Sequence, residues 1–320
     1  MSILNISVIT PVYNAEKFLR KSVESALQFE EVKEVILIED GSKDQSLKVC
    51  KELIQQYDRV KLFQHPNGTN KGAGASRNLG IENSNQEYIA FLDADDYYLI
   101  NRFEAEKKIF IENSNADGVY GALGIHFYSD KAKKILLDTN LSRNENDGEN
   151  EFLFTVGVNI PHNELFDRWI GIGKPLSKFH LDCLTIKAKT LKTLPYYFNV
   201  NLRLHQDTDF IIRLSYYFKL YPGIIDKEIG IRGVHENNRI TTIKKHTLKF
   251  YYNQYKLHYS LYHWAKETSL PKEYISYLEY KKNSLYLQSI LPLEKVKLLL
   301  LKLTGKKNIP SLLYKKLIKK

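Results

Sequence analysis

The sequence is poor in cysteine and has no long apolar run. Two cysteines among 320 residues exclude a disulfide scaffold and a cysteine-rich metal cluster, and they favour a reducing, cytoplasmic compartment. The longest apolar runs, such as residues 298–301, are far shorter than the roughly 18 residues that a membrane-spanning helix needs. The N-terminus has no basic segment followed by an apolar one. We therefore expect neither a transmembrane helix nor a signal peptide.

Arginine is absent from the last quarter of the chain, where the positive charge is concentrated. The net charge is +10, yet residues 241–320 hold 17 lysines and four glutamates, which gives +13 and leaves −3 for the first 240 residues. A basic tail of this kind suits an anionic partner. Nucleic acid is not expected, because arginine usually reads base edges. We expect a peripheral location at the inner face of an anionic membrane. The alternative to membrane binding is that the tail forms helices whose lysines are simply solvated. The charge pattern also leaves open whether the tail mediates a homodimer.

The first hundred residues alternate between apolar runs and amphipathic stretches. We expect strands at 6–10, 35–38, 60–63 and 88–92 with helices between them, and Pro11 is expected to end the first strand. This alternation predicts an α/β fold, doubly wound around a mostly parallel sheet. The segment beyond about residue 243 has the pattern of aromatic helices.

Polar clusters follow the predicted strands, at residues 10–14, 39–42, 67–78 and 93–96. Ligands of an open α/β sheet bind beyond the carboxyl ends of its strands, so these clusters should converge. Asp93, Asp95 and Asp96 offer hard oxygen ligands for Mg²⁺ or Mn²⁺, although aspartates at a strand end can also form a turn or cap a helix. Lys71 and Arg77 flank a predicted helix start, which suits a diphosphate.

The glycine-rich segment matches neither of two common nucleotide-binding motifs. It lacks the Gly-Lys-Ser/Thr ending of a P-loop, and no Gly-x-Gly-x-x-Gly follows the first strand. A nucleotide triphosphatase and a dinucleotide dehydrogenase are therefore disfavoured. A nucleotidyltransferase is also disfavoured, because a triphosphate loop directly after the first strand is missing.

Four motifs together resemble the family 2 glycosyltransferases, which have the GT-A fold and include enzymes of bacterial surface-polysaccharide synthesis. The motifs are Ser-Val-Ile-Thr-Pro-Val-Tyr-Asn at 7–14, Glu-Asp-Gly-Ser at 39–42, Asn-x-Gly-x-x-x-Ser-Arg-Asn-x-Gly at 70–80 and Asp-Ala-Asp-Asp at 93–96. The resemblance is dense over residues 5–105 and looser to about 242. Glu39 replaces the usual first aspartate of the second motif. The resemblance implies a GT-A domain at 1–242, with a nucleotide-sugar half at 1–115 and an acceptor half at 116–242, followed by a helical tail at 243–320.

The resemblance also implies roles for the donor site, which in this family is usually a site for a uridine diphosphate sugar. Thr10, Pro11 and Tyr13 are expected at the base and ribose, and Asp40 is expected to accept the uracil N–H. Lys71 and Arg77 are expected near the base or diphosphate. Asp93 would contact ribose or sugar hydroxyls, and Asp95, with Asp93, would hold Mn²⁺ or Mg²⁺ on the diphosphate.

The second half is expected to supply the general base and the acceptor site. The family usually has Glu-Asp where this chain has Gln206-Asp207, so Asp207 is the predicted base and Asp209 the second choice, although Asp207 can also be a simple N-cap. His235 is expected in a loop that closes over the diphosphate, as a metal or phosphate ligand or as a surface residue. Further candidates for the acceptor side or the loops are Asp96, His180, His205 and Arg239.

Together these expectations describe an inverting, metal-dependent glycosyltransferase. It would move a sugar from a nucleotide-sugar donor, with a hexosyl or N-acetylhexosaminyl group, to a hydroxyl of a glycan or lipid-linked acceptor. The alternative is a GT-A scaffold that still binds nucleotide sugar but has lost catalysis, since Gln206 replaces an acid beside the predicted base.

Overall fold

The computed structural model describes residues 4–138, 159–173, 178–238 and 246–290. The chain forms two compact units, one made of residues 1–133 and 143–235 and the other of residues 134–142 and 236–320. The first unit contains both sheets, and the second contains two long helices. In the described ranges, no helix is both long and apolar enough to cross a membrane.

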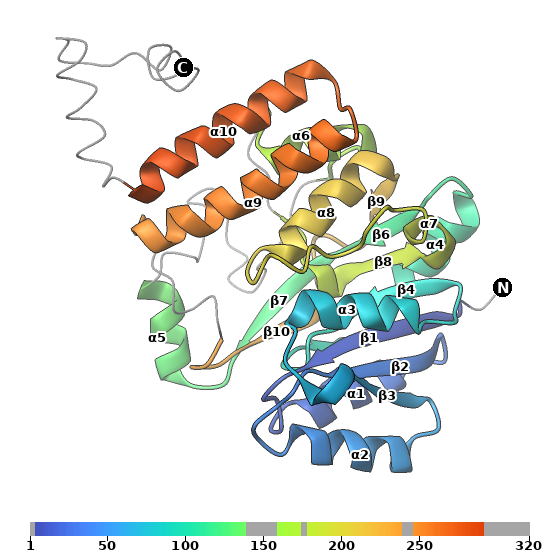
Figure 1. Ribbon diagram of the computed structural model, residues 1–320. Coiled ribbons are helices and arrows are strands. Elements are labelled where there is room, and N and C mark those ends of the chain that lie inside the picture. The colour runs from blue at the N-terminus through green and yellow to red at the C-terminus, as the bar shows by residue number, and fades with distance from the viewer. Residues whose placement is uncertain (1–3, 139–158, 174–177, 239–245, 291–320) are drawn as a thin grey trace, which may run out of the picture. The chain divides into compact units, whose positions relative to one another are not determined.

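A seven-stranded sheet is the centre of the first unit, with the strand order β3-β2-β1-β4-β8-β6-β9 (Figure 1). Strands β1, β2, β3 and β4 run parallel to one another, and β8 is antiparallel to both β4 and β6. The strand bounds are Ile6–Val12 for β1, Val32–Glu39 for β2, Val60–Gln64 for β3, Tyr88–Phe91 for β4, Gly118–Tyr120 for β6, Leu184–Lys187 for β8 and Leu220–Pro222 for β9. The predicted α/β class is confirmed.

The first strand is longer than the sequence predicts, because it continues through Pro11 to Val12. Pairing with β4 ends at Ile9↔Phe91, whereas pairing with β2 continues to Val12↔Glu39. Backbone groups of successive residues in a strand point to alternate sides: the Ile9 carbonyl points to β4 and the Val12 carbonyl points to β2. The ring nitrogen of Pro11 therefore points to the β4 side, at a position beyond the last β1–β4 residue pair. The missing N–H therefore costs no ladder hydrogen bond, and the expectation that Pro11 ends the strand is wrong.

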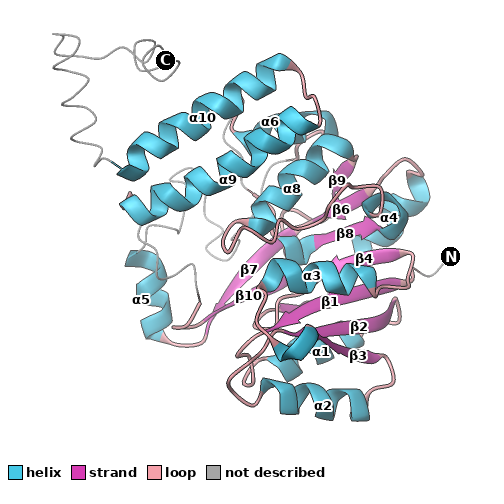
Figure 2. Ribbon diagram, in the orientation of Figure 1, coloured by secondary structure: helices cyan, strands magenta, loops and turns pink. Residues whose placement is uncertain are grey.

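Helices cover both faces of this sheet because its central strands are apolar on both faces. Ile6, Val8 and Val12 of β1 belong to one core with residues of α1 (Leu19–Leu27), α2 (Ser46–Gln56) and α4 (Glu104–Glu112). The side chain of Ile9 lies on the opposite face of the sheet, against Gly80 of α3 (Ala73–Glu82). Any side chain at position 80 would clash with Ile9, because a Cβ there would lie too close to it. Helix α3 therefore packs closely across β1 (Figure 2).

A smaller sheet has the order β5-β10-β7, and its strands are Tyr97–Tyr98, Glu228–Val234 and Ala122–Phe127. Strand β10 is parallel to β7 and antiparallel to β5. The remaining described elements of the first unit are the helices α6 (His162–Ile170), α7 (Ala188–Leu191) and α8 (Gln206–Tyr217) and the 3-10 helices η1 (Pro66–Gly68) and η2 (Leu181–Cys183); α5 (Asp130–Asp138) has residues in both units.

The second unit contains α9 (Leu248–Glu267) and α10 (Lys272–Ile290), which pack against each other. Thr247 caps α9 by accepting a hydrogen bond from the N–H of Phe250. Leu257, Leu261 and Trp264 of α9 and Leu278 of α10 are buried. The predicted C-terminal helical region is thus present, and residues 291–320 of the basic tail lie outside the described residues.

Candidate active site

Asp40 follows β2 and fixes the glycine-rich loop at the carboxyl edge of the sheet. Its Oδ1 accepts a hydrogen bond from the Lys71 N–H at 2.6 Å, and its Oδ2 accepts one from the Gly72 N–H at 2.9 Å. The Asp40 carbonyl accepts another from Asn70. Asp40 is 2% exposed, and these bonds satisfy its carboxylate oxygens in the interior. The contact of Asp40 with a uracil N–H stays a prediction. A carboxylate oxygen of Asp40 would have to accept that N–H with a lone pair that the Lys71 and Gly72 N–H groups do not use.

Arg77 lies on α3 with most of its guanidinium in the protein interior. Its Nη2 is 2.5 Å from Oδ1 of Asp93, which follows β4. Its Nε and Nη1 have no hydrogen-bond partner within the described ranges, although Arg77 is only 4% exposed. Burial opposes the charge on Arg77, but the charges of Asp93 and Asp207 raise its pKa. Arg77 therefore has two buried donor nitrogens without a partner, and its positive charge offsets part of the negative charge of the carboxylates near it.

Asp93 and Asp95 are held in different ways, although only one residue separates them. Burial alone would raise the pKa of Asp93, but the charges of Arg77 and His180 bring it below its ordinary value. Asp95 Oδ2 lies 3.1 Å from Nε2 of His235. The ring of Phe18 stacks on the His235 ring with a centroid distance of 4.7 Å. The sequence predicts His235 as a loop residue. The structure brings it into contact with Asp95, the predicted metal ligand, which lies 140 residues earlier in the chain.

The end of β10 explains why His235 reaches this place. The N–H of Gly233 donates to Asp96 Oδ1 at 2.9 Å. A Cβ on Gly233 would clash with the Asp95 carbonyl oxygen, so only glycine lets β10 approach the aspartate turn this closely. His235 follows directly after β10 ends at Val234.

A divalent cation fits the residues at this turn. Ligand oxygens of Asp93, Asp95 and Asp96 lie within 4.8 Å of one another, and carboxylate oxygens are what Mg²⁺ and Mn²⁺ prefer. Asp93 also pairs with Arg77, Asp96 accepts from the Gly233 N–H, and Asp95 lies beside His235, so each of the three carboxylates has a protein partner as well.

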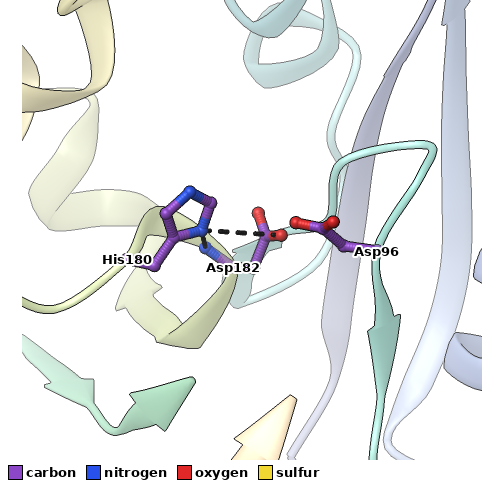
Figure 3. A group of neighbouring side chains, drawn as sticks. All are labelled: Asp96, His180 and Asp182. Carbon is purple, nitrogen blue, oxygen red and sulfur yellow. Dashed lines mark hydrogen bonds and ion pairs between the residues drawn. The ribbon is translucent and has the colours of Figure 1, made fainter. Parts of the chain in front are cut away.

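A second group at the same turn contains a residue that the sequence analysis missed. Asp182, in η2, faces Asp96, and His180 Nδ1 lies 3.6 Å from Asp182 Oδ2 (Figure 3). Asp182 is 1% exposed, and among the described residues only the carboxyl of Asp96 is in a position to hydrogen-bond to its carboxylate oxygens. Burial and the nearby charge of Asp95 raise the pKa of Asp96. Burial and the nearby charge of Asp93 raise the pKa of Asp182.

A proton or a cation between two carboxyls in this position would relieve the repulsion between their charges. The ligand atoms of Asp96, His180 and Asp182 also lie within 4.8 Å of one another. The predicted acceptor-side role of His180 stays a prediction, and its position beside Asp182 places it next to the aspartate turn. Asp182 carries no motif of its own, and only its two-residue spacing from His180 could have pointed to it.

Asp207 opens the first turn of α8. Its Oδ1 accepts a hydrogen bond from the Thr208 N–H at 2.8 Å. The charge of Asp207 raises the pKa of Arg77 and partly offsets the effect of burial on the pKa values of Lys178 and His205. Burial lowers the pKa of His205, and the charge of Asp207 only partly opposes this. Asp207 is half-buried, so a substrate hydroxyl can reach it.

Asp209, the second choice as base, has a different environment. It is fully buried and accepts a hydrogen bond from Arg213 Nε at 2.9 Å. Arg213 also donates to the carbonyls of Tyr196 and Tyr197, so the pair fixes α8 to the preceding loop. This placement favours a structural role.

The remaining predicted residues divide by exposure. Thr10 is fully buried, with no hydrogen-bond partner for its hydroxyl in the described part of the chain, while Pro11 and Tyr13 are half-buried and the Lys71 side chain is exposed. Arg239 lies outside the described residues.

Comparison with known proteins identifies the family. The sequence model described as "Glycosyl transferase family 2" matches residues 7–170, which is half of the chain. The chain belongs to glycosyl transferase family 2. The resemblance that the four motifs carry is thereby confirmed.

Curated relatives match about a third of the chain. An "Uncharacterized glycosyltransferase" of Haemophilus influenzae is 42% identical over 109 residues, covering 34% of this chain and 43% of that protein. The "Minor teichoic acid biosynthesis protein GgaA" of Bacillus subtilis is 35% identical over 118 residues, covering 35% of this chain and 26% of that protein. These matches span less than half of each relative's length.

Solved structures of the same fold extend over most of the chain. The structure of S. aureus TarS 1–349 has a TM-score of 0.57 and 18% identity, covering 89% of this chain and 72% of that one. The structure of TarS 1–349 in complex with UDP-GlcNAc has a TM-score of 0.56 and 16% identity, covering 89% and 72%. At this identity the likeness shows the fold, which is that of the GT-A glycosyltransferases, as predicted.

Proposed function

We propose that this protein is an inverting glycosyltransferase that moves a sugar from a uridine diphosphate sugar to a hydroxyl of a cell-surface glycan or a lipid-linked acceptor. The observation that supports the proposal is the ion pair of Arg77 with Asp93, whose ligand oxygen lies within 4.8 Å of that of Asp95, together with the charge of Asp207 acting on Arg77. The family supports sugar transfer. Similarity to a teichoic acid biosynthesis protein supports a surface polymer, and the shared fold of a structure solved with UDP-GlcNAc supports a UDP-sugar.

The chemistry divides between two groups of side chains. Arg77, with two unused donors in the protein interior, would bind an anionic part of the donor, and Asp93 would accept from its hydroxyls. Asp207 would take the proton of the acceptor hydroxyl as that oxygen attacks the anomeric carbon from the side opposite the diphosphate. Asp95, with Asp93 and His235 beside it, would hold Mn²⁺ or Mg²⁺. That ion, when bound, neutralises charge on a diphosphate leaving group.

The proposal includes a peripheral contact with an anionic membrane surface. The charge of +13 over residues 241–320 supports it, because an anionic leaflet attracts each lysine near it. Such a contact would bring the enzyme to a lipid-linked acceptor.

The donor site is tested by thermal-shift titration of UDP and GDP with and without Mn²⁺, on the wild type and on Asp95→Ala. A ligand that binds only the folded state raises the melting temperature by mass action. We expect a Mn²⁺-dependent shift with UDP that the substitution abolishes. A shift with GDP alone would contradict the uridine donor. No shift with either nucleotide would contradict the donor site itself, and binding without turnover of any UDP-sugar would instead favour the non-catalytic scaffold.

A further inference from the structure

Gln206 occupies the position where the family usually has an acid, and the structure gives it a partner far away in sequence. Its Oε1 accepts a hydrogen bond from the N–H of Gly74 at 3.2 Å. Gly74 lies in the first turn of α3, where N–H groups have no partner inside the helix. Gly72, the N-cap residue, contributes no side-chain hydrogen bond. Gln206 therefore caps α3 from a distance of 132 residues along the chain.

The contact depends on the absence of a side chain at position 74. A Cβ on Gly74 would stand 2.9 Å from Gln206 Oε1 and 3.4 Å from its Cδ. The nearest backbone-anchored neighbour, Phe198 Cβ, would be at 3.4 Å, which is ordinary contact. A methyl group at this position would therefore displace the flexible Gln206 side chain and little else.

This hydrogen bond joins the two helices that carry the proposed reacting groups. Arg77 lies three residues after Gly74 on α3, and Asp207 directly follows Gln206 on α8. Arg77 would hold the donor, and Asp207 would take the acceptor proton. The Gln206–Gly74 hydrogen bond therefore joins the residue before Asp207 to the turn of α3 that precedes Arg77.

A separate set of contacts holds the two helices together deeper in the protein. The Asn78 side chain donates to the Phe198 carbonyl at 3.0 Å and accepts from the Phe198 N–H at 2.8 Å. Phe198 stacks on Phe210 of α8 with a centroid distance of 4.1 Å. Because these contacts remain when Gln206 is removed, its loss would loosen the helix ends without unfolding the domain.

We propose that Gln206 is a positioning residue, whose carboxamide caps α3 and fixes Asp207 relative to Arg77. The amide supplies the same acceptor oxygen as a glutamate without adding a second negative charge beside Asp207. Gln206 then preserves the geometry of the site, and its presence does not mark the loss of catalysis. This inference rests on the proposed function, since it assumes that Asp207 is the base.

The test uses Gln206→Ala, Gly74→Ala and Gln206→Glu in the full chain. Turnover is measured as UDP release from a panel of UDP-glucose, UDP-galactose, UDP-GlcNAc and UDP-GalNAc, with water as the attacking hydroxyl, so that the sugar leaves as the free sugar. The dissociation constant of UDP with Mn²⁺ and the melting temperature are measured in parallel. We expect both alanine variants to lower turnover about 10- to 100-fold at unchanged UDP affinity, because small misplacements of reacting groups have effects of this size. Gly74→Ala is not expected to lower the melting temperature, because alanine is the better helix former.

The double variant Gln206→Ala/Gly74→Ala should be no slower than the slower single variant, because both changes break one hydrogen bond. Gln206→Glu should restore most of the turnover. Wild-type turnover in both alanine variants would overturn the proposal. So would a Gln206→Glu variant as slow as Gln206→Ala, or a loss of turnover that appears only together with a lower melting temperature.

Two further measurements separate this proposal from the proposed function. If Asp207→Asn abolishes turnover while both alanine variants keep it, only the role of Gln206 is wrong. If Asp207→Asn keeps turnover, the base assignment is wrong and the positioning role falls with it. Amide exchange needs no donor sugar: Gln206→Ala should speed exchange in the first turns of α3 and α8, and unchanged exchange would contradict the cap.

Discussion

Asp207 is the side chain on which the proposed chemistry depends most. General base catalysis contributes about 10²–10⁴ in rate, so Asp207→Asn should lower turnover by about that factor. The amide keeps the shape of the side chain but cannot take a proton, so UDP affinity should be unchanged. The measurement is UDP release from the UDP-sugar panel, beside calorimetric titration with UDP and Mn²⁺.

Asp58→Asn is the matched control, because Asp58 is exposed in the turn before β3, at the edge of the sheet opposite the site. It should leave both quantities unchanged. An Asp207→Asn variant with wild-type turnover would show that another group acts as the base.

His235 tests how the metal is held. Its Nε2 lies 3.1 Å from Asp95, and its ring is stacked on Phe18. A partner of a metal-binding carboxylate typically contributes 10- to 100-fold in metal affinity, so His235→Ala should raise the Mn²⁺ concentration needed for the UDP thermal shift about 10- to 100-fold. Phe18→Leu removes the stacking ring and leaves the imidazole, so it should have a smaller effect. An unchanged Mn²⁺ requirement in His235→Ala would assign the histidine to packing alone.

Residues within motifs could be proposed from the sequence, and most residues outside them could not. Asp93, Asp95 and Asp207 follow a strand or open a helix, so the topology of an α/β sheet already brings them to one edge. His235 could be named, but its contact with Asp95 depends on Gly233 in a strand of the second sheet. Asp182 and the partner of Gln206 depend on how distant segments pack, and no local pattern records that.

A buried carboxylate holds the first three strands together at the element scale. Glu34 of β2 accepts from Ser7 Oγ of β1 at 2.6 Å and from the Asn85 N–H at 2.8 Å, and it pairs with Lys61 of β3 at 2.5 Å. Burial would raise the pKa of Glu34, but Lys61, Ser7 and Asn85 together bring it below its ordinary value of 4.5. The charged form of Glu34 is thus the one that stabilises the sheet.

Glu34→Gln should lower the free energy of unfolding at pH 7 by about 1.5–3 kcal/mol, the range for hydrogen bonds to a charged group. Because the pKa of Glu34 is lower in the folded state, this stabilisation is present above pH 4.5 and is lost as the pH falls through the folded-state pKa. Urea unfolding of both proteins between pH 7 and pH 3 should show the two free energies converging at acid pH. A difference that stays constant over this range would assign the effect to packing.

Lys61→Met gives a comparison for the same network. Lys61 is 43% exposed, and exposed partners of an ion pair contribute less than about 1 kcal/mol. The substitution should therefore cost less than Glu34→Gln.

Elements with a clear period were predictable, and their ends were not. The four parallel strands follow from apolar runs, which are typical of strands buried on both faces. The extension of β1 through Pro11 was not predictable, because it depends on pairing with β4 ending before pairing with β2 does. The second sheet joins residues 97–98, 122–127 and 228–234, and pairing over such distances leaves little trace in a single sequence.

Charge is the property of the whole molecule that leads to a test of membrane contact. The first 240 residues carry −3 and the last 80 carry +13, so attraction to an anionic surface should come from the C-terminal part. The full-length protein should co-sediment with phosphatidylcholine vesicles that contain phosphatidylglycerol and not with pure phosphatidylcholine vesicles. Each lysine near such a surface contributes about 1 kcal/mol, and the attraction falls off within a Debye length of about 10 Å at 0.1 M salt.

Binding to the anionic vesicles should therefore be strong at about 0.05 M salt and weak near 0.5 M, where the screening length is much shorter. Replacing Lys315, Lys316, Lys319 and Lys320 by glutamine removes four of the positive charges and should shift the salt midpoint downward, while the Mn²⁺-dependent UDP shift stays as in the wild type. Binding that resists high salt would indicate apolar insertion instead of charge attraction. Equal binding to neutral and anionic vesicles would rule out the charge of the tail as the cause, and the tail would then be a solvated surface or an interface between copies of the chain.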